Sequence, residues 1–346
     1  MRVLIREAEM LTKRRRDILN LAVAEYISRG VPVASEAIAR HGLGISPATI
    51  RNEMMELEAE GYLAQPHTSA GRVPTDRGYR QYIECLRDGI ALSEVEQLLI
   101  YHQFHQVERE IEEWTRLAAA ILARMLRNVA IVTLPKSRQC RLHHLELVAL
   151  QETLVLLILI LREAKLKQQM LVLDEAVSDD ELEAAARRLN SAFLGLTASQ
   201  IGRKKLQLTP LEGAATKAVV QMMRAEEEDE YEEPHVDGLR HILAHPELAA
   251  SSKVAAVVEL LEQKSLLRAL LPTLVAGGGV QVVIGTENTQ DVMRECSLVF
   301  SRYGIPGEVG GALGVVGPTR MQYDVAIPAV GFVSNIMSEL VCEYYG

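Results

Sequence analysis

The strongest constraint on the fold is a regular series of helix-start and helix-stop residues near the beginning of the chain. Thr12 is a favourable N-cap for a helix that Gly30 ends, and the segment between them carries apolar residues at helical spacing. Ser35 predicts the start of a second, short helix, which ends at Gly42. This part of the chain therefore predicts two helices joined by a tight turn.

A third helix follows the same rules. Ser46 is a favourable N-cap, Pro47 occupies the first helical position, where a missing N–H costs nothing, and Gly61 ends the helix. Its apolar side is formed by Ile50, Met54 and Leu57. From Tyr62 to about Thr75 the pattern fits two short strands that flank a polar loop. The order of helix, helix, helix and two-stranded wing is that of a winged helix-turn-helix, a DNA-binding fold.

The polar face of the third helix is suited to reading DNA bases. Helix-turn-helix proteins insert the N-terminal part of this helix into the major groove, so we expect base contacts from Thr49, Arg51 and Asn52. Arginine can pair with guanine and asparagine with adenine, each through two hydrogen bonds. Ser46 has the smaller role of capping the helix, whose exposed N-terminus can also bind a phosphate.

Two further groups complete the predicted DNA site. The wing surrounds Arg72 with small residues, which predicts that this side chain reaches the minor groove or a phosphate from the loop tip. Further donors in the wing are His67, Thr68 and Ser69. A basic cluster at the start of the first helix, Lys13, Arg14, Arg15 and Arg16, is well placed for phosphate contacts, which we expect from Lys13, Arg14 and Arg16 in particular. Taken by itself, this cluster is equally consistent with solvated charges at a helix end.

Net charge argues mildly against a DNA-binding function. The chain carries −9 overall, and residues 1–90 hold 13 basic and 12 acidic residues. A nearly neutral domain can still bind a polyanion if its basic groups face one way, whereas the acidic remainder disfavours non-specific adhesion. The charged first residues lack a secretory signal, and the longest apolar run, residues 154–161, is too short to span a bilayer. We therefore expect a cytoplasmic protein without a membrane partner.

The rest of the chain predicts one sheet interrupted by helices. Helical periodicity covers residues 93–127, and strands are expected at 130–134, 143–150, 154–162 and 167–173, with the third as a central strand covered on both faces. Residues 178–271 are mainly helical, and their acidic run at 226–233 is expected to be solvated. Strands return at 280–284 and 314–316, before a closing helix from Pro328. The simplest interpretation is a domain with another inserted in it.

No motif predicts catalysis, a metal or a cofactor. His241 and His245 lack a third ligand, as does the pair His143 and His144. The glycines at 277–279 precede a strand rather than a helix, which is the wrong order for a phosphate loop. The four cysteines lie far apart and are expected to be free thiols, most of them buried. We expect no enzyme, and a turn at Gly317-Pro318 that positions Arg320.

Three stretches carry a resemblance to a known family. They are SPATIRNEMMELEAEGYLAQPHTSAGRVPTDRGYRQY at 46–82, IGTEN at 284–288 and GGALGVVGPTRMQY at 310–323. They resemble the HrcA family of bacterial heat-inducible transcription repressors. The matches lie near both ends of the chain and in the same order, so the resemblance spans nearly all of it.

The resemblance implies a multidomain α+β fold. It combines an N-terminal winged helix-turn-helix, a GAF-like α/β domain with an antiparallel sheet, and an inserted, mainly helical dimerisation domain. Together with the strand pattern, it places these parts at residues 1–90 for DNA binding, 91–177 and 272–346 for the GAF-like domain, and 178–271 for the insertion.

The resemblance also implies a function. It points to a homodimer that represses chaperone operons from an inverted-repeat, double-stranded operator, loses activity on heating and is kept active by a GroEL-type chaperonin. Two alternatives stay open. One is a metabolite sensor whose GAF-like domain binds a small molecule, and the other is a repressor that is also an enzyme.

Overall fold

The computed structural model describes residues 11–67, 70–86, 90–107, 110–137, 140–162, 166–228, 234–245, 256–257, 259, 279–306 and 308–345. These residues belong to two compact units. The first consists of Met1–Val132, Pro234–Arg302 and Ala312–Ile336, and the second of Thr133–Glu233, Tyr303–Gly311 and Met337–Gly346.

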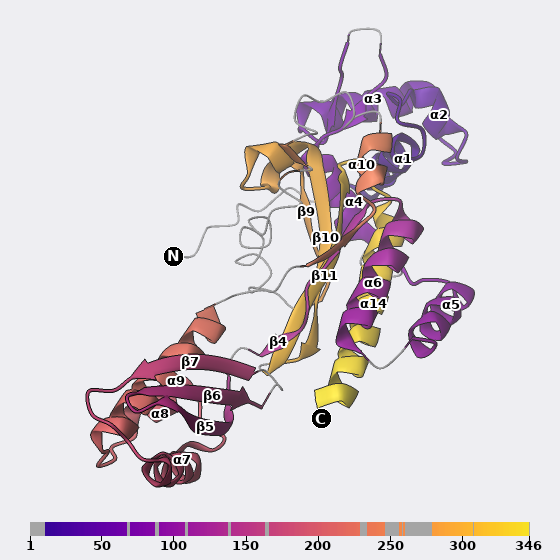
Figure 1. Cartoon of the computed structure of the whole chain (residues 1–346). Helices are drawn as coiled ribbons and strands as arrows, with labels where there is room; N and C mark the ends of the chain where they lie inside the picture. Colours follow the sequence, from indigo (N-terminus) through magenta and orange to yellow (C-terminus); the bar gives the residue numbers. More distant parts are fainter. Residues whose placement is uncertain are drawn as a thin grey trace. The chain divides into compact units, whose positions relative to one another are not determined.

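The winged helix predicted at the N-terminus is present in the first unit (Figure 1). Its elements are α1 (Lys13–Arg29), α2 (Ser35–Ala39), α3 (Pro47–Ala59), β1 (Leu63–Ala64) and β2 (Val73–Pro74). The two strands pair antiparallel and form the wing. Thr12 and Ser46 cap their helices as predicted, whereas Ser35 is the first residue of α2 and is buried instead of capping it.

A further helix, α4 (Asp76–Leu86), follows the wing directly and was not predicted. Its first turn is stabilised by Thr75, whose Oγ1 accepts a hydrogen bond from the backbone N–H of Gly78 at 3.2 Å. Tyr79, Tyr82 and Ile83 lie on one face and are buried. Because these residues follow the helical spacing of three and four positions, they carry the signal that could have predicted α4.

The first unit also contains most of an antiparallel sheet. Its strand order is β8 (His235–Asp237), β3 (Val129–Val132), β11 (Val309–Pro318), β10 (Cys296–Ile305) and β9 (Gln281–Ile284), and β4 (Lys136–Ser137) pairs with the far end of β11. The short 3₁₀ helices η1 (Gly285–Glu287) and η2 (Asp291–Glu295) join β9 to β10. Of these strands, β4, β8 and β10 were missed, and β11 is longer than expected.

Helices pack on this sheet. α6 (Ile111–Leu126) contacts β3 and β8, α10 (Leu239–Ala244) contacts β3, and α5 (Glu94–His105) packs on α6. The predicted helix over 93–127 is therefore divided between His105 and Ile111, before Trp114, where a break was expected. All four residues of β3 are buried, as are nearly all of β11, so both faces of these strands are covered.

The closing helix, α14 (Tyr323–Tyr345), begins five residues before the predicted start at Pro328. Proline lacks one backbone donor, and α14 continues through it. By length and mean hydropathy, 1.7, this helix resembles a membrane span, but half of that apolar window is buried inside the protein. The backbone N–H of Gly304 also donates to Ser338 Oγ of α14 at 3.0 Å. These contacts are those of a core helix.

The second unit has its own antiparallel sheet, which corrects the predicted sheet membership. β5 (Leu142–Gln151), β6 (Leu154–Leu161) and β7 (Leu166–Val172) pair in that order and form a three-stranded sheet apart from the one described above. The sequence predicted that these three strands belong to the first sheet. They instead share a core with α7 (Asp179–Phe193), α8 (Ala198–Arg203) and α9 (Pro210–Glu228). The apolar strands bury their inner faces against these helices, a solution that sequence pattern does not specify.

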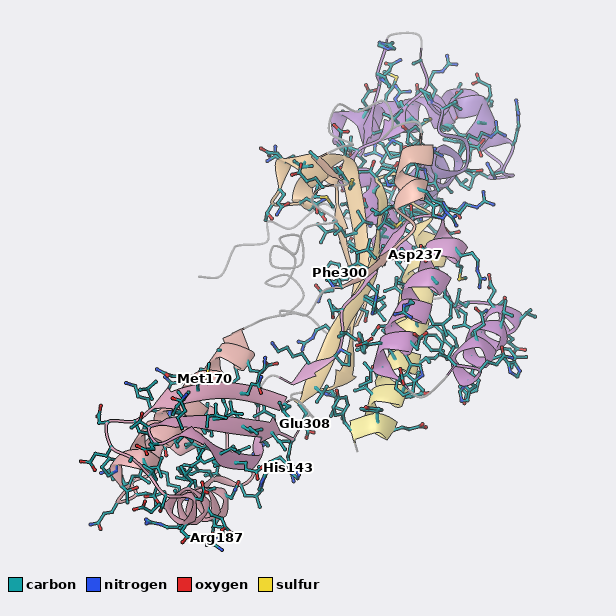
Figure 2. All side chains as sticks on the ribbon, in the orientation of Figure 1. His143, Met170, Arg187, Asp237, Phe300 and Glu308 are labelled. Carbon is teal, nitrogen blue, oxygen red and sulfur yellow. The ribbon has the colours of Figure 1, made fainter. Side chains whose placement is uncertain are left out.

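Within the described residues, elements pack on only one face of this sheet. β6 is the central strand, as predicted, but its residues alternate between buried and partly exposed, so the expectation of cover on both faces is wrong. The inner face includes Val155, Leu157 and Leu159, and the outer face is open. In Figure 2, Met170 projects from β7 on the side away from α7, which carries Arg187.

The acidic run after α9 also differs from expectation at its start. Glu226 belongs to α9, is 5 % exposed and pairs with Lys167 Nζ of β7 at 2.6 Å. A buried carboxylate needs such a partner, since an unpaired charge in the interior is costly. Residues 229–233 of the run lie outside the described residues.

Candidate nucleic-acid interface

The recognition helix α3 presents the predicted face to solvent. Ile50, Met54 and Leu57 are buried against the domain, which leaves the N-terminal turn and the opposite side accessible. On that side Arg51 and Asn52 are exposed, and Thr49 is partly exposed. The structure thus brings together the residues predicted to contact bases.

Ser46 holds the start of α3 in place. Its Oγ accepts a hydrogen bond from the backbone N–H of Thr49 at 3.1 Å, and the two hydroxyls lie 2.9 Å apart. Ser46 is exposed, so the N-terminal end of α3, with its unpaired N–H groups and positive dipole end, faces solvent. Such an end binds a phosphate readily.

Arg51 is already engaged, but weakly. Its Nη2 lies 3.3 Å from Oε1 of Glu36 on α2, and the two side chains are 63 % and 55 % exposed. An ion pair as exposed as this contributes at most about 1 kcal/mol, because water screens it. Arg51 can therefore exchange Glu36 for a base edge or a phosphate at little cost.

Arg72 occupies a different place from the predicted wing tip. Its Nε donates to Oε2 of Glu58 on α3 at 2.8 Å, and its side chain is only 13 % exposed. Its backbone forms two hydrogen bonds with Val33, of 2.8 and 2.9 Å. Arg72 thus ties the base of the wing to α3 and to the segment before α2, and sequence spacing gave no sign of this role.

The wing tip itself is only partly described. His67 is exposed, whereas Thr68 and Ser69 lie outside the described residues. Gln65 Nε2 donates to the carbonyl of Ala70 at 3.0 Å and bridges the two sides of the loop. A groove of about 440 Å³ runs between the wing and α3, and its lining includes Glu36, Arg51, Met55, Gln65 and Arg72.

The basic cluster of α1 divides into exposed and engaged members. Lys13 and Arg14 are exposed, although Arg14 Nη1 also lies 3.8 Å from Oε1 of Glu53. Arg16 is partly buried, and its Nη2 lies 3.4 Å from the carbonyl of Leu11. Arg15, a further member of the predicted cluster, instead donates to Glu53 of α3 at 2.9 Å and to Glu60, the C-cap of α3, at 2.5 Å. The hydrogen bond to Glu53 raises the pKa of Arg15 above its ordinary value. Arg15 is therefore a link between α1 and α3.

The remaining predictions concern a metal site, the cysteines and a turn near the C-terminus. Among the described residues, no three His, Cys, Asp or Glu side chains gather as a metal site would require. The four cysteines are free; Cys140 and Cys296 are buried, Cys85 is partly exposed and Cys342 is exposed. The predicted turn at Gly317-Pro318 is wrong, because β11 runs through Pro318 and the chain turns at the two residues after it.

Family models match both parts of the chain. Residues 10–85 match the model described as "Winged helix-turn-helix transcription repressor, HrcA DNA-binding", and residues 112–327 match "HrcA protein C terminal domain". The second match extends across both sheets. The two models together account for most of the sequence.

Similar proteins give the same result over nearly the whole length. The chain is 47 % identical to a "Heat-inducible transcription repressor HrcA" of Dehalococcoides mccartyi, with 97 % of this chain and 98 % of that protein covered. It is 45 % identical to a protein of the same name from a Roseiflexus species, with 97 % and 96 % covered. A crystal structure titled as a hypothetical protein shares the fold at 23 % identity and a TM-score of 0.64, with 96 % and 99 % covered. The chain therefore belongs to the HrcA family.

Proposed function

We propose that this protein is a heat-inducible transcription repressor that binds double-stranded operator DNA through its winged helix. The observation that carries the proposal is the exposed N-terminal turn of α3, where Thr49, Arg51 and Asn52 share one accessible face. This is the part of a recognition helix that enters the major groove. Family membership supports the same function, which needs no catalytic group or cofactor and acts in the cytoplasm.

The structure refines the proposed roles. Arg51 and Asn52 read bases with Thr49 beside them, and the capped end at Ser46 binds a phosphate. Lys13 and Arg14 are exposed and suited to phosphate contacts. His67, Thr68 and Ser69 remain proposed wing contacts. Arg16 and Arg72 are engaged within the domain, so they reach DNA only if their present partners release them.

Selection of bound DNA from a random pool tests the proposal. We expect one recurring sequence with dyad symmetry, and Arg51→Ala should relax the preference at one base position in each half-site. Arg14→Ala is the matched control, because loss of a phosphate contact should weaken all sequences alike and lower the salt slope by about 0.9. Binding without sequence preference, or the same behaviour from both variants, would contradict the assigned roles.

The proposal includes a homodimer formed through the open face of the β5–β6–β7 sheet. The cross-strand register places Val148, Leu156 and Met170 in one row across the three strands, and Leu154 beside Val172 in the next. Val148, Met170 and Val172 are 38, 63 and 80 % exposed. A continuous apolar face of this kind is an interaction surface, and a second copy is its occupant because two half-sites require two recognition helices related by a two-fold axis.

Analytical ultracentrifugation tests the dimer. Met170→Asp places a charge in the open face and should convert the dimer to a monomer. The matched control is Glu183→Gln on α7, a 66 % exposed side chain that pairs with Arg187 of its own helix. An unchanged dimer in Met170→Asp would rule out this interface.

Regulation by heat and by a GroEL-type chaperonin also belongs to the proposal. A repressor of marginal stability loses DNA affinity as its native fraction falls, and a chaperonin that refolds it makes repression follow the amount of free chaperonin. α5 presents Val95, Leu98 and Leu99, each more than half exposed, as an apolar surface of the kind that other proteins bind. Operator occupancy after mild heating should recover more with chaperonin than without it. Equal recovery would contradict this part.

A further inference from the structure

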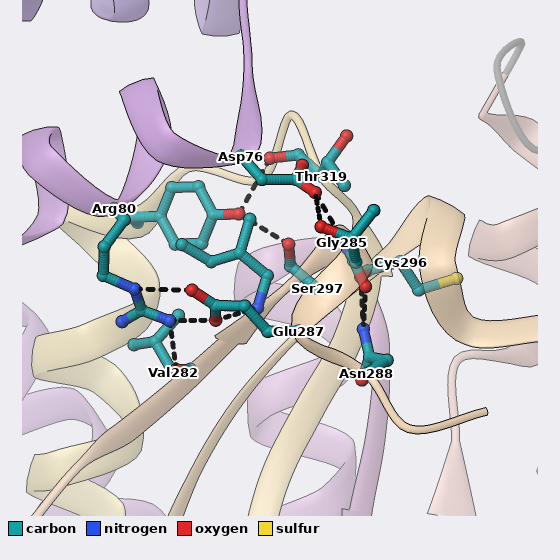
Figure 3. Close-up of polar contacts among 12 residues, drawn as sticks. Asp76, Arg80, Val282, Gly285, Glu287, Asn288, Cys296, Ser297 and Thr319 are labelled. Carbon is teal, nitrogen blue, oxygen red and sulfur yellow. Dashed lines mark hydrogen bonds and ion pairs between the residues drawn. The ribbon is translucent and has the colours of Figure 1, made fainter. Parts of the chain in front are cut away.

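We propose that α4 and the loops after β9 and β11 form a clasp that fixes the direction of the winged helix and so determines which half-site spacing the repressor accepts. The clasp consists of Asp76 and Arg80 on α4, Thr286 and Glu287 in η1, and Arg320 after β11. Figure 3 shows the part around Asp76, Arg80 and Glu287. All five lie in the first unit. The inference rests on the proposed function as an operator-binding dimer.

Asp76 makes the first contact. Its Oδ2 accepts two hydrogen bonds from Thr286, one from the backbone N–H at 2.8 Å and one from Oγ1 at 2.6 Å. A carboxylate held by two donors of one residue is fixed in direction as well as in distance. Asp76 is also the first residue of α4, so this contact holds the start of the helix.

Arg80 makes the second contact, one turn further along α4. Its guanidinium binds both carboxylate oxygens of Glu287, through Nε at 2.9 Å and through Nη2. Nη2 also donates to the backbone carbonyl of Val282 in β9 at 2.9 Å. Glu287 is held from behind, because its Oε2 accepts from the N–H of Ile284 at 2.9 Å. This bidentate pair is more directional than a single surface ion pair.

The η1 loop is shaped for this approach. Gly285 has a φ of +46°, and a Cβ at this position would lie 2.4 Å from a carboxylate oxygen of Asp76, so only glycine fits. Asn288 is buried and donates to the carbonyls of Gly285, Met293 and Cys296 at 2.9–3.0 Å. The motif IGTEN therefore has a physical role: it receives α4.

Arg320 provides an attachment at a different helix. Its Nη1 donates at 2.9 Å to the carbonyl of Ile27, in the last turn of α1, and its guanidinium lies against Gly30. The last carbonyls of a helix lack intrahelical partners and carry partial negative charge, so a cation is stabilised there. The rings of Tyr79 and Tyr323 are both buried and lie against each other in a tilted arrangement, with centroids 6.0 Å apart and planes 57° apart.

Attachment through two helices restrains rotation, whereas one attachment would leave a pivot. In a two-fold dimer, the direction of each winged helix sets the distance between the two recognition helices, which must match half-sites about one DNA turn apart. A held winged helix accepts one spacing. A winged helix that is not held accepts several spacings. Its affinity for the correct spacing is lower, because fixing its direction then costs free energy on binding.

The test uses the full-length protein and the operator selected from a random pool, with one base pair added to or removed from the spacer. Arg80→Gln and Thr286→Val each remove clasp bonds without adding bulk. Arg77→Gln is the matched control, because Arg77 is also on α4 but donates to Glu60 and Tyr62 within the winged helix. Circular dichroism melting confirms that each variant is folded.

We expect the clasp variants to lose discrimination between spacings by about tenfold, while their affinity for a single half-site stays unchanged. Arg80→Gln combined with Glu287→Gln should add little to either change, because both remove one interaction. Undiminished spacing discrimination in folded clasp variants would overturn the inference. Absence of any selected operator for the unmodified protein would instead overturn the proposed function, and this inference with it.

Discussion

The two central strands β6 and β11 reverse the expected relation between hydrophobicity and burial. β6 reads LVLLILIL and is apolar throughout, yet only every second residue is buried. β11 reads VGGALGVVGP and contains four glycines, yet nearly all of it is buried. The difference shows that a strand's composition states what it can bury, whereas the elements packed on each face decide what it does bury.

Glycines explain how β11 is covered so closely. A Cβ at Gly314 would lie 2.5 Å from the carbonyl oxygen of Val299, and one at Gly311 would lie 2.6 Å from the ring of Tyr303. The missing side chains let the neighbouring strand approach, and the hydroxyl of Tyr303 donates to the backbone carbonyl of Thr133 at 2.5 Å. On the outer face of β6, by contrast, large side chains remain and no described element covers them.

The largest effect should come from the buried face of β6. Leu157 is completely buried in the core of the second unit, so Leu157→Ala leaves a cavity and should lower the free energy of unfolding by about 2–5 kcal/mol. Denaturant unfolding measures this change. Leu156→Ala, one residue away on the open face, is the control and should have a much smaller effect in the monomer. Equal losses would show that both faces are packed.

The second-largest loss of stability should come from overpacking β11. Gly314→Ala forces a methyl group against the backbone of β10 and should destabilise the protein by about 3 kcal/mol, because backbone atoms cannot move aside as a side chain can. Gly213→Ala is the matched control, since that glycine lies in α9 with no atom within 4 Å of the added Cβ. The control should be neutral or stabilising by up to about 1 kcal/mol. A tolerated alanine at Gly314 would contradict the tight approach.

Alkaline pH should destabilise the region that contains Tyr82 and should have less effect on residues 142–228. Burial raises the pKa of Tyr82 from 10.0 to about 12. The unfolded chain then loses its proton first, so stability should be constant below pH 10 and fall by about 2 kcal/mol as the pH rises through the folded pKa. Residues 142–228 contain no tyrosine. Denaturant midpoints at several pH values should show this fall, and Tyr82→Phe should reduce it; an unchanged pH profile would refute the assignment.

The smallest effect should come from the open face. Val172 is 80 % exposed at the edge strand β7, so Val172→Thr should change the free energy of unfolding of the monomer by less than about 0.5 kcal/mol. The measurement is denaturant unfolding at a protein concentration low enough to prevent association. A loss above 1 kcal/mol would mean that the monomer itself covers this face.

The features that could be predicted from the sequence are those that depend on residues close together in the chain. The caps at Thr12 and Ser46 and the apolar side of α3 placed the recognition helix and its exposed residues correctly. The strand β10 was not predicted. It begins directly after the 3₁₀ helix η2, so no turn pattern in the sequence marks its start. Arg72 was expected at the wing tip, but the ion pair with Glu58 depends on how the wing folds back on α3, which spacing cannot express.

The sequence by itself determined the winged helix, the family and the exposed face of α3 that we propose contacts DNA, because caps, helical periodicity and short motifs are local properties. The tertiary structure decided which strands share a sheet, which face of β6 stays open and what the motif IGTEN contacts. Those features join residues about 200 positions apart, as Asp76 and Thr286 are joined, and the free energy of such contacts depends on distance and burial rather than on sequence order.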